Sequence, residues 1–169
     1  DALSPALGFL PRPGTRQATF NVAYQPRPTS PSLSWIRQAF FEVQTLRVED
    51  LQGQLQTWQI FTAPFNIVTQ SGDHFEANWQ PEKEVLTQAF EISPGVIIPA
   101  GEYRFDRYRI QAESAPTRVW QVATTLWSGE FYGGHLVQWI PSMGWNAQDG
   151  HIRVTASAEN DFVHLPGGS

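Results

Sequence analysis

The part of the chain that most constrains the fold is residues 118–139, RVWQVATTLWSGEFYGGHLVQW. It contains two ten-residue arms with alternating side chains, 118–127 and 130–139, joined by Ser128-Gly129. A two-residue connection that contains Gly is typical of a β-hairpin. With this turn, Trp120 lies opposite Val137, one face is mostly apolar, and the other face mixes polar and apolar side chains. We therefore predict a pair of antiparallel strands.

This hairpin allows two interpretations. A ten-residue strand tilted by about 45° spans roughly 25 Å, which is the height of the apolar band of an outer-membrane barrel. Tryptophans near both ends of the arms stand where an aromatic girdle lies in such barrels. The alternative is an ordinary hairpin of a soluble sandwich with Trp in its core. His135 on the apolar face counts against lipid, so the hairpin alone does not decide.

Short stretches of alternating side chains, separated by turn residues, occur along the rest of the chain. They predict an all-β domain, an antiparallel meander of roughly eight strands. Pro64 interrupts one stretch and predicts a bulge or an edge position there. Residues 1–15 are expected to form an irregular lead-in and residues 141–150 a loop. The other extended stretches are residues 17–25, 34–48, 54–70, 74–79, 82–92, 96–98, 102–111 and 152–159.

Composition excludes several classes of protein. The 169 residues fit a single domain, and a net charge of −5 without a basic patch argues against nucleic-acid binding. The absence of Cys excludes disulfides and cysteine-based metal sites. No run approaches the length of about 18 apolar residues that a membrane-spanning helix needs. The strands of a β-barrel stay compatible with this composition, because they place apolar residues only at every second position.

The densest charge cluster is a candidate binding site. It consists of Arg104, Asp106, Arg107 and Arg109, with Glu130 as a further member. In the lumen of a barrel, the arginines are expected to pair with carboxylates such as Glu76 or Glu130, which is a structural role. The alternative function is an anion-selective constriction.

Three tryptophans are candidate aromatic platforms for sugar rings, namely Trp79, Trp139 and Trp145. Packing in a core or in an interfacial belt is the alternative for each of them.

No catalytic residue, metal ligand or cofactor site is predicted. Ser128 lies in Trp-Ser-Gly and lacks the Gly-x-Ser-x-Gly pattern of a nucleophile elbow. Glu82 and Glu84 could form a carboxylate pair for glycoside hydrolysis, but beside Lys83 they favour a solvated turn. The His residues show no metal-binding spacing, and each lies in a different segment: His74, His135, His151 and His164.

Several motifs together resemble a known family. In chain order they are Gly8-Phe9-Leu10-Pro11-Arg12, Ser71-Gly72-Asp73, Phe90 to Ile92 with Pro94 to Tyr103, Ser128 to Gly134, and Asn160 to Pro166. This order resembles the C-terminal domain of unknown function in bacterial proteins that begin with a family 9-like carbohydrate-binding domain. The resemblance covers most of the chain.

The resemblance implies an outer-membrane-type β-barrel, of which residues 1–169 form one β domain and the opening portion. It implies a non-enzymatic protein in the bacterial outer membrane, with the lipid bilayer as partner and glycan capture or transport through an N-terminal domain that this sequence lacks. It supplies no catalytic residue. The alternative is a soluble β-sandwich or small closed barrel, periplasmic or secreted, that binds carbohydrate.

The alternation also predicts which side chains share a face. One set is expected on the outward or core-facing rows: Phe20, Val22, Tyr103, Phe105, Phe131, Val137, Ile152 and Val154. The other set is expected on the opposite side: Asn21, Arg104, Glu130, Arg153 and Thr155.

Overall fold

The structure is a computed structural model that describes residues 14–147 and 151–165. These residues form strands and no α-helix; their one helical element is the short 3-10 turn η1 (Pro31–Leu33). The all-β prediction is therefore confirmed. The strands are β1 (Thr15–Tyr24), β2 (Ile36–Ala39), β3 (Phe41–Asp50), β4 (Leu55–Thr69), β5 (His74–Leu86), β6 (Phe90–Ser93), β7 (Val96–Ile98), β8 (Gly101–Glu113), β9 (Trp120–Phe131), β10 (Gly134–Asn146), β11 (Arg153–Ser157) and β12 (Asn160–His164).

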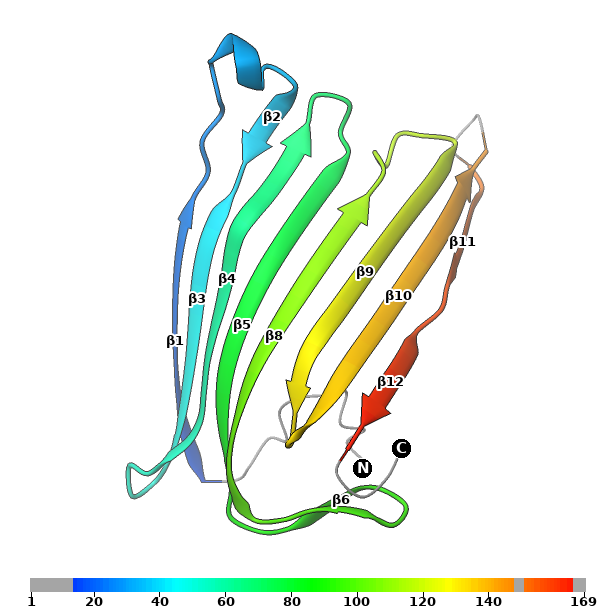
Figure 1. Cartoon of the computed structure of the whole chain (residues 1–169). Coiled ribbons are helices and arrows are strands. Elements are labelled where there is room, and N and C mark those ends of the chain that lie inside the picture. Colours follow the sequence, from blue (N-terminus) through cyan, green and yellow to red (C-terminus); the bar gives the residue numbers. More distant parts are fainter. Residues whose placement is uncertain (1–13, 148–150, 166–169) are drawn as a thin grey trace.

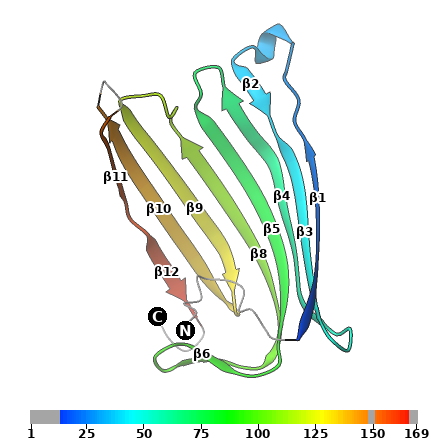
Figure 2. The same cartoon turned by 180° about the vertical axis from the view of Figure 1, so that it is seen from behind.

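Ten of these strands form one curved antiparallel sheet (Figure 1). Its order is β1-β3-β4-β5-β8-β9-β10-β11. The short strand β2 pairs with the part of β4 that extends past the end of β3, and β12 pairs with the part of β10 that extends past the end of β11. The sheet is thus eight strands wide, and the predicted meander is confirmed. In the described residues it is not closed: no strand pairs with the outer sides of β1 and of β11 and β12, which lie at opposite edges (Figure 2).

The central hairpin exists, but its predicted turn is wrong. β9 continues through Ser128-Gly129, and the chain turns at Tyr132-Gly133, so Trp120 pairs with Trp145 and not with Val137. The φ angles of Tyr132 and Gly133 are 46° and 79°, and two positive values are the signature of a type I′ hairpin turn. Tyr is rarely found in this conformation, which is why the sequence pattern missed the turn.

Contacts with the adjacent Phe131 and with residues of other strands stabilise this turn. The Tyr132 ring lies edge-on against Phe90, Tyr103, Phe105 and Phe131, with ring centroids 4.8 to 5.5 Å apart. Its hydroxyl donates a hydrogen bond to Glu84. Aromatic packing of this kind offsets the cost of a positive φ at a residue other than Gly.

The expected side-chain rows are correct for part of the sheet only. The register places Phe20, Val22, Val137 and Val154 on one face, and Asn21, Arg153 and Thr155 on the other, as predicted. It places Tyr103, Phe105 and Phe131 on the face of Asn21, and Arg104 and Glu130 on the face of Phe20, contrary to the prediction. Ile152 lies outside the strands, before β11.

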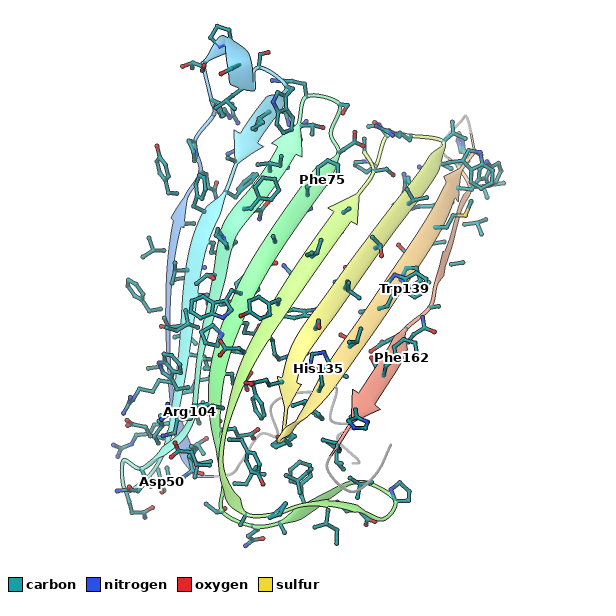
Figure 3. The ribbon with its side chains drawn as sticks, viewed as in Figure 1. Asp50, Phe75, Arg104, His135, Trp139 and Phe162 are labelled. Carbon is teal, nitrogen blue, oxygen red and sulfur yellow. The ribbon has the colours of Figure 1, made fainter. Side chains whose placement is uncertain are left out.

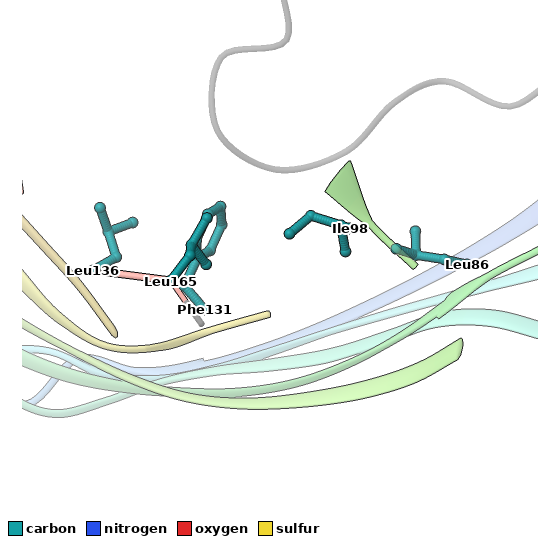
Figure 4. Packing of buried hydrophobic residues seen from close by; sticks show 5 residues of the cluster. All are labelled: Leu86, Ile98, Phe131, Leu136 and Leu165. Carbon is teal, nitrogen blue, oxygen red and sulfur yellow. The ribbon is translucent and has the colours of Figure 1, made fainter. Parts of the chain in front are cut away.

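The exchange of faces has a local cause. At the end of the sheet that carries the Tyr132-Gly133 turn (the lower end in Figure 1), the β6–β7 hairpin packs against one face. Aromatic side chains of β8 and β9 turn toward it at this end. The buried cluster consists of Leu86, Ile98, Phe131, Leu136 and Leu165 (Figure 4).

Two prolines bear on predictions made from the sequence, a bulge at Pro64 and a loop that begins at Pro141. The register of β4 against β5 shifts between Thr62 and Phe65, which confirms the bulge predicted at Pro64. The loop predicted at 141–150 is wrong, because β10 continues to Asn146. Pro141 is tolerated in this strand since it lies where pairing passes from β11 to β12.

Two predicted stretches differ at their ends. Residues 82–86 belong to β5, and the stretch predicted as one strand over 82–92 is divided before β6. Of the predicted lead-in 1–15, Thr15 belongs to β1, while residues 1–13, including the Gly8 to Arg12 motif, lie outside the described residues.

A glycine substitution tests the closeness of β10 and β12. A Cβ on Gly134 would collide with the backbone carbonyl oxygen of His164, whereas a Cβ on Gly101 would meet only the Tyr103 ring at 3.7 Å. We expect Gly134→Ala to lower the free energy of unfolding by about 1–3 kcal/mol and to expose the β12 amides to hydrogen exchange. Gly101→Ala should change it by less than about 0.5 kcal/mol. Equal effects in denaturant unfolding would contradict this register.

Candidate functional site

The two faces of the sheet differ in chemistry, and we name them the apolar face and the polar face. Seventeen of the twenty-three exposed large apolar side chains share one face of the paired strands. They extend over the full width from β1 to β12. They are Phe20, Val22, Tyr24, Phe41, Val43, Phe65, Phe75, Trp79, Tyr108, Ile110, Trp120, Val122, Leu126, Trp139, Met143, Val154 and Phe162.

Charged residues on the apolar face are confined to its lower end. In Figure 3, Arg104 and His135 lie near this end, whereas Phe75 and Trp139 lie above them. Above this end, the described strands place no charged side chain on the apolar face. The charged side chains at the lower end are Arg16, Arg47, Glu49, Lys83, Glu102, Arg104, Asp106 and Glu130.

The polar face carries a hydrogen-bonded network centred on Arg109. Its Nη2 donates to Oε1 of Glu76 at 2.6 Å, and its Nε donates to Oδ1 of Asn78 at 2.7 Å. Asn78 in turn donates to the same Glu76 carboxylate. The guanidinium also lies 5.2 Å from the ring centroid of Phe61 and 5.3 Å from that of Trp127. Because Glu76 and Asn78 are buried, this network holds polar groups in fixed positions on the polar face.

A second arginine lies beside the first. Arg107 stacks over Trp127 at 5.0 Å and interacts electrostatically with Glu82 of β5. Gln59 and Gln80 donate hydrogen bonds to the Glu82 carboxylate. Every fully buried side-chain nitrogen and oxygen in the described residues has a hydrogen-bond partner. The polar face is therefore a satisfied network, as buried polar groups require.

At the opposite, upper end of the sheet, Asp73 connects two loops. Its carboxylate accepts hydrogen bonds from the Ala115 backbone N–H and from Arg118. Hydrogen bonds from the Ser71 hydroxyl and from Ala115, together with the charge of Arg118, hold the pKa of Asp73 below its ordinary value. The Ser71-Gly72-Asp73 turn is thus tied to the β8–β9 connection.

The sheet divides the predicted charge cluster between its two faces. Arg107 and Arg109 lie on the polar face, and the predicted pairing of an arginine with Glu76 is present. Arg104, Asp106 and Glu130 lie on the apolar face at its lower end, where Glu130 accepts a hydrogen bond from the Asp106 backbone N–H. Alternation along β8 separates neighbours in the sequence by the thickness of the sheet.

The three predicted aromatic platforms all lie on the apolar face. Trp79 donates its Nε1–H to Asp106 at 2.8 Å, and Trp139 donates to the Thr124 hydroxyl at 2.9 Å. Trp145 lies 6.5 Å from Trp120 at the upper end. The tryptophan on the polar face is Trp127, which the sequence analysis did not select. Its position next to two arginines follows from register and has no signal in the local sequence.

The chain has no significant match among protein-family profiles, curated proteins or solved structures. The family resemblance and what it implies therefore stay predictions. In residues 14–147 and 151–165, no helix is long and apolar enough to cross a membrane. The same residues contain no group of three His, Cys, Asp or Glu side chains arranged to hold a metal ion.

Two arginine substitutions compare what the Arg109 network and an exposed ion pair contribute to the free energy of unfolding. Arg109→Met would leave the buried Glu76 carboxylate without its cation, and we expect a loss of about 3–5 kcal/mol in the free energy of unfolding. Arg104→Met removes an exposed ion pair with Glu102 and should cost less than about 1 kcal/mol. Denaturant titrations of both variants measure the difference. Similar losses would show that the Arg109 network does not organise the polar face.

Proposed function

We propose that this chain forms part of the wall of a non-enzymatic outer-membrane β-barrel in a bacterial surface protein. In this proposal the apolar face contacts lipid acyl chains, and the polar face lines the wet interior. The observation that carries the proposal is the apolar face itself, which is continuous across all eight strand positions.

The size of the apolar face argues against an uncovered surface in water. Eight strands spaced by about 4.8 Å are roughly 38 Å wide, and seven residues along a strand add roughly 20 Å, so the face covers on the order of 700–800 Å². The largest apolar patch of a typical soluble monomer is about 300–600 Å². A face of this size needs a cover, and the described residues supply none.

The strand lengths and the distribution of side chains on the apolar face fit a lipid bilayer as its cover. The seven long strands contain 10 to 15 residues each, while a tilted membrane-spanning strand needs about 9–11. Charged residues begin only at the lower end, where headgroups and water would solvate them. The N–H groups of Trp79 and Trp139 have acceptors within the sheet, as hydrocarbon surroundings require.

The polar face fits the interior of a barrel. Lumen-facing side chains of such barrels are polar and alternate with lipid-facing apolar ones. The Arg109 network and the Glu82 contacts provide a polar surface whose charges are largely paired within the sheet.

The proposal also requires partners for the two edges. Unpaired backbone N–H and C=O groups are too costly in hydrocarbon, so further strands, or the edge strands of a second copy of this chain in vesicles, must pair with β1 and with β11 and β12. Because neighbouring strands alternate in direction across eight positions, the two edges run antiparallel to each other. An even-numbered segment of an antiparallel barrel has this property.

The alternative, a soluble carbohydrate-binding sandwich, needs a second sheet over the apolar face. The described residues form only one other sheet, the two-stranded β6–β7, and it packs against residues of the polar face. A bilayer is therefore the better cover. An association with glycan capture or transport, through a further domain, belongs to the proposal on the strength of the family resemblance.

Neighbouring substitutions on β9 test the proposal. Leu126 is exposed on the apolar face in the middle of β9, and Thr125 lies on the polar face opposite Gln111. In lipid vesicles, Leu126→Arg should cost about 2–4 kcal/mol of unfolding free energy toward mid-bilayer depth, because nothing there solvates a guanidinium. Thr125→Arg should cost much less, since the wet interior of the proposed barrel solvates the guanidinium.

The parent chain is the control for both variants and should float with the vesicles in a density gradient. Equal penalties for the two variants, or a parent chain that never binds the vesicles, would contradict the proposal.

A further inference from the structure

We infer that the β6–β7 hairpin is an inward-folded plug that narrows the lower end of the barrel interior. This inference rests on the proposed function, because it takes the polar face to line the interior. It assigns to residues 87–100 a role in restricting passage.

The first observation is where the hairpin packs. Ile98 of β7 is 4% exposed and belongs to the same cluster as Leu86 of β5, Phe131 of β9 and Leu136 of β10 (Figure 4). The register places Leu86, Phe131 and Leu136 on the polar face. The hairpin therefore lies on the inner side of the wall.

The second observation is the reach of the hairpin. It leaves the sheet between β5 and β8, and its cluster includes Leu165, which directly follows β12 at the edge of the sheet. Val163 of β12 is also packed against this cluster. The hairpin thus crosses the lower ends of β9 and β10 on the polar face, where a lumen would open.

The third observation is the two-sided character of β7. Ile97 is 65% exposed, while its neighbour Ile98 is almost fully buried. The turn between β6 and β7 is closed by Glu91, whose side chain accepts a hydrogen bond from the Gly95 backbone N–H at 2.6 Å. One side of β7 is buried against the sheet and the other side is exposed, as expected for a docked hairpin and not for a solvated loop.

The fourth observation concerns chain length. Leu86 and Gly101 are direct register partners at the ends of β5 and β8. A two-residue turn can connect antiparallel strands at such a pair. The chain inserts fourteen residues there, and within this insert β6 and β7 pair with each other as antiparallel strands. Some outer-membrane barrels have their lumen blocked by an inward-folded segment in this way.

Four proteins test the inference: the parent chain, Ile98→Ser, Ile97→Ser, and a variant in which Asn-Gly replaces residues 87–100. Ile98→Ser should undock the hairpin, and Ile97→Ser is its matched control on the exposed side. The Asn-Gly variant removes the hairpin and keeps the β5–β8 pairing, so it serves if Ile98→Ser fails to fold. Each protein is reconstituted into phosphatidylcholine vesicles that contain a small fluorescent dye. Flotation then measures vesicle binding, and dye release measures passage.

We expect all four proteins to float with the vesicles. Dye release should be several-fold faster for Ile98→Ser and for the Asn-Gly variant than for the parent chain and Ile97→Ser. Flotation of all four with equal release would overturn the plug and leave the barrel wall intact. A parent chain that does not float would overturn the barrel wall, and the plug with it.

Discussion

The strict alternation of side chains along a strand is the constraint on which the rest of this structure depends. Once neighbouring strands are in register, every second residue of each strand shares one face, and a single shift would exchange the faces. Here the register collects the large exposed apolar side chains on one face and the Arg109 network on the other. The need to remove the first face from water and to keep the second hydrated leads to the proposed barrel wall.

The lower end of the sheet departs from this division, and the departure has one cause. There, Tyr103, Phe105 and Phe131 occupy the polar face because the β6–β7 hairpin packs on it, while Arg104 and Glu130 stand on the opposite face. In the proposed barrel, the charged residues on the apolar face mark the level at which the membrane would end. The aromatic packing on the polar face marks the level at which the plug would begin. The strained Tyr132-Gly133 turn lies in the middle of this packing.

The sequence predicted the features that depend on local patterns. Alternation predicted the all-β meander, and the Pro64 interruption predicted the bulge in β4. The hairpin turn was misplaced because Ser128-Gly129 is the better local turn signal, whereas Tyr132 turns only with the help of Glu84 and rings distant in sequence. The division of the charge cluster between the two faces and the position of Trp127 could not be predicted either, since their partners on β4, β5 and β9 are set by the register between strands.

The most direct test of the proposed barrel wall is whether lipid chains contact one face of the sheet and not the other. Two variants would each keep a single tryptophan, Trp139 on the apolar face or Trp127 on the polar face, with Phe at the other tryptophan positions. Both would be reconstituted into vesicles of phospholipid with brominated acyl chains, which quench tryptophan fluorescence on contact. If the apolar face contacts lipid, Trp139 should be quenched strongly and Trp127 only a little. Equal quenching of the two, or none for Trp139, would contradict the proposed barrel wall.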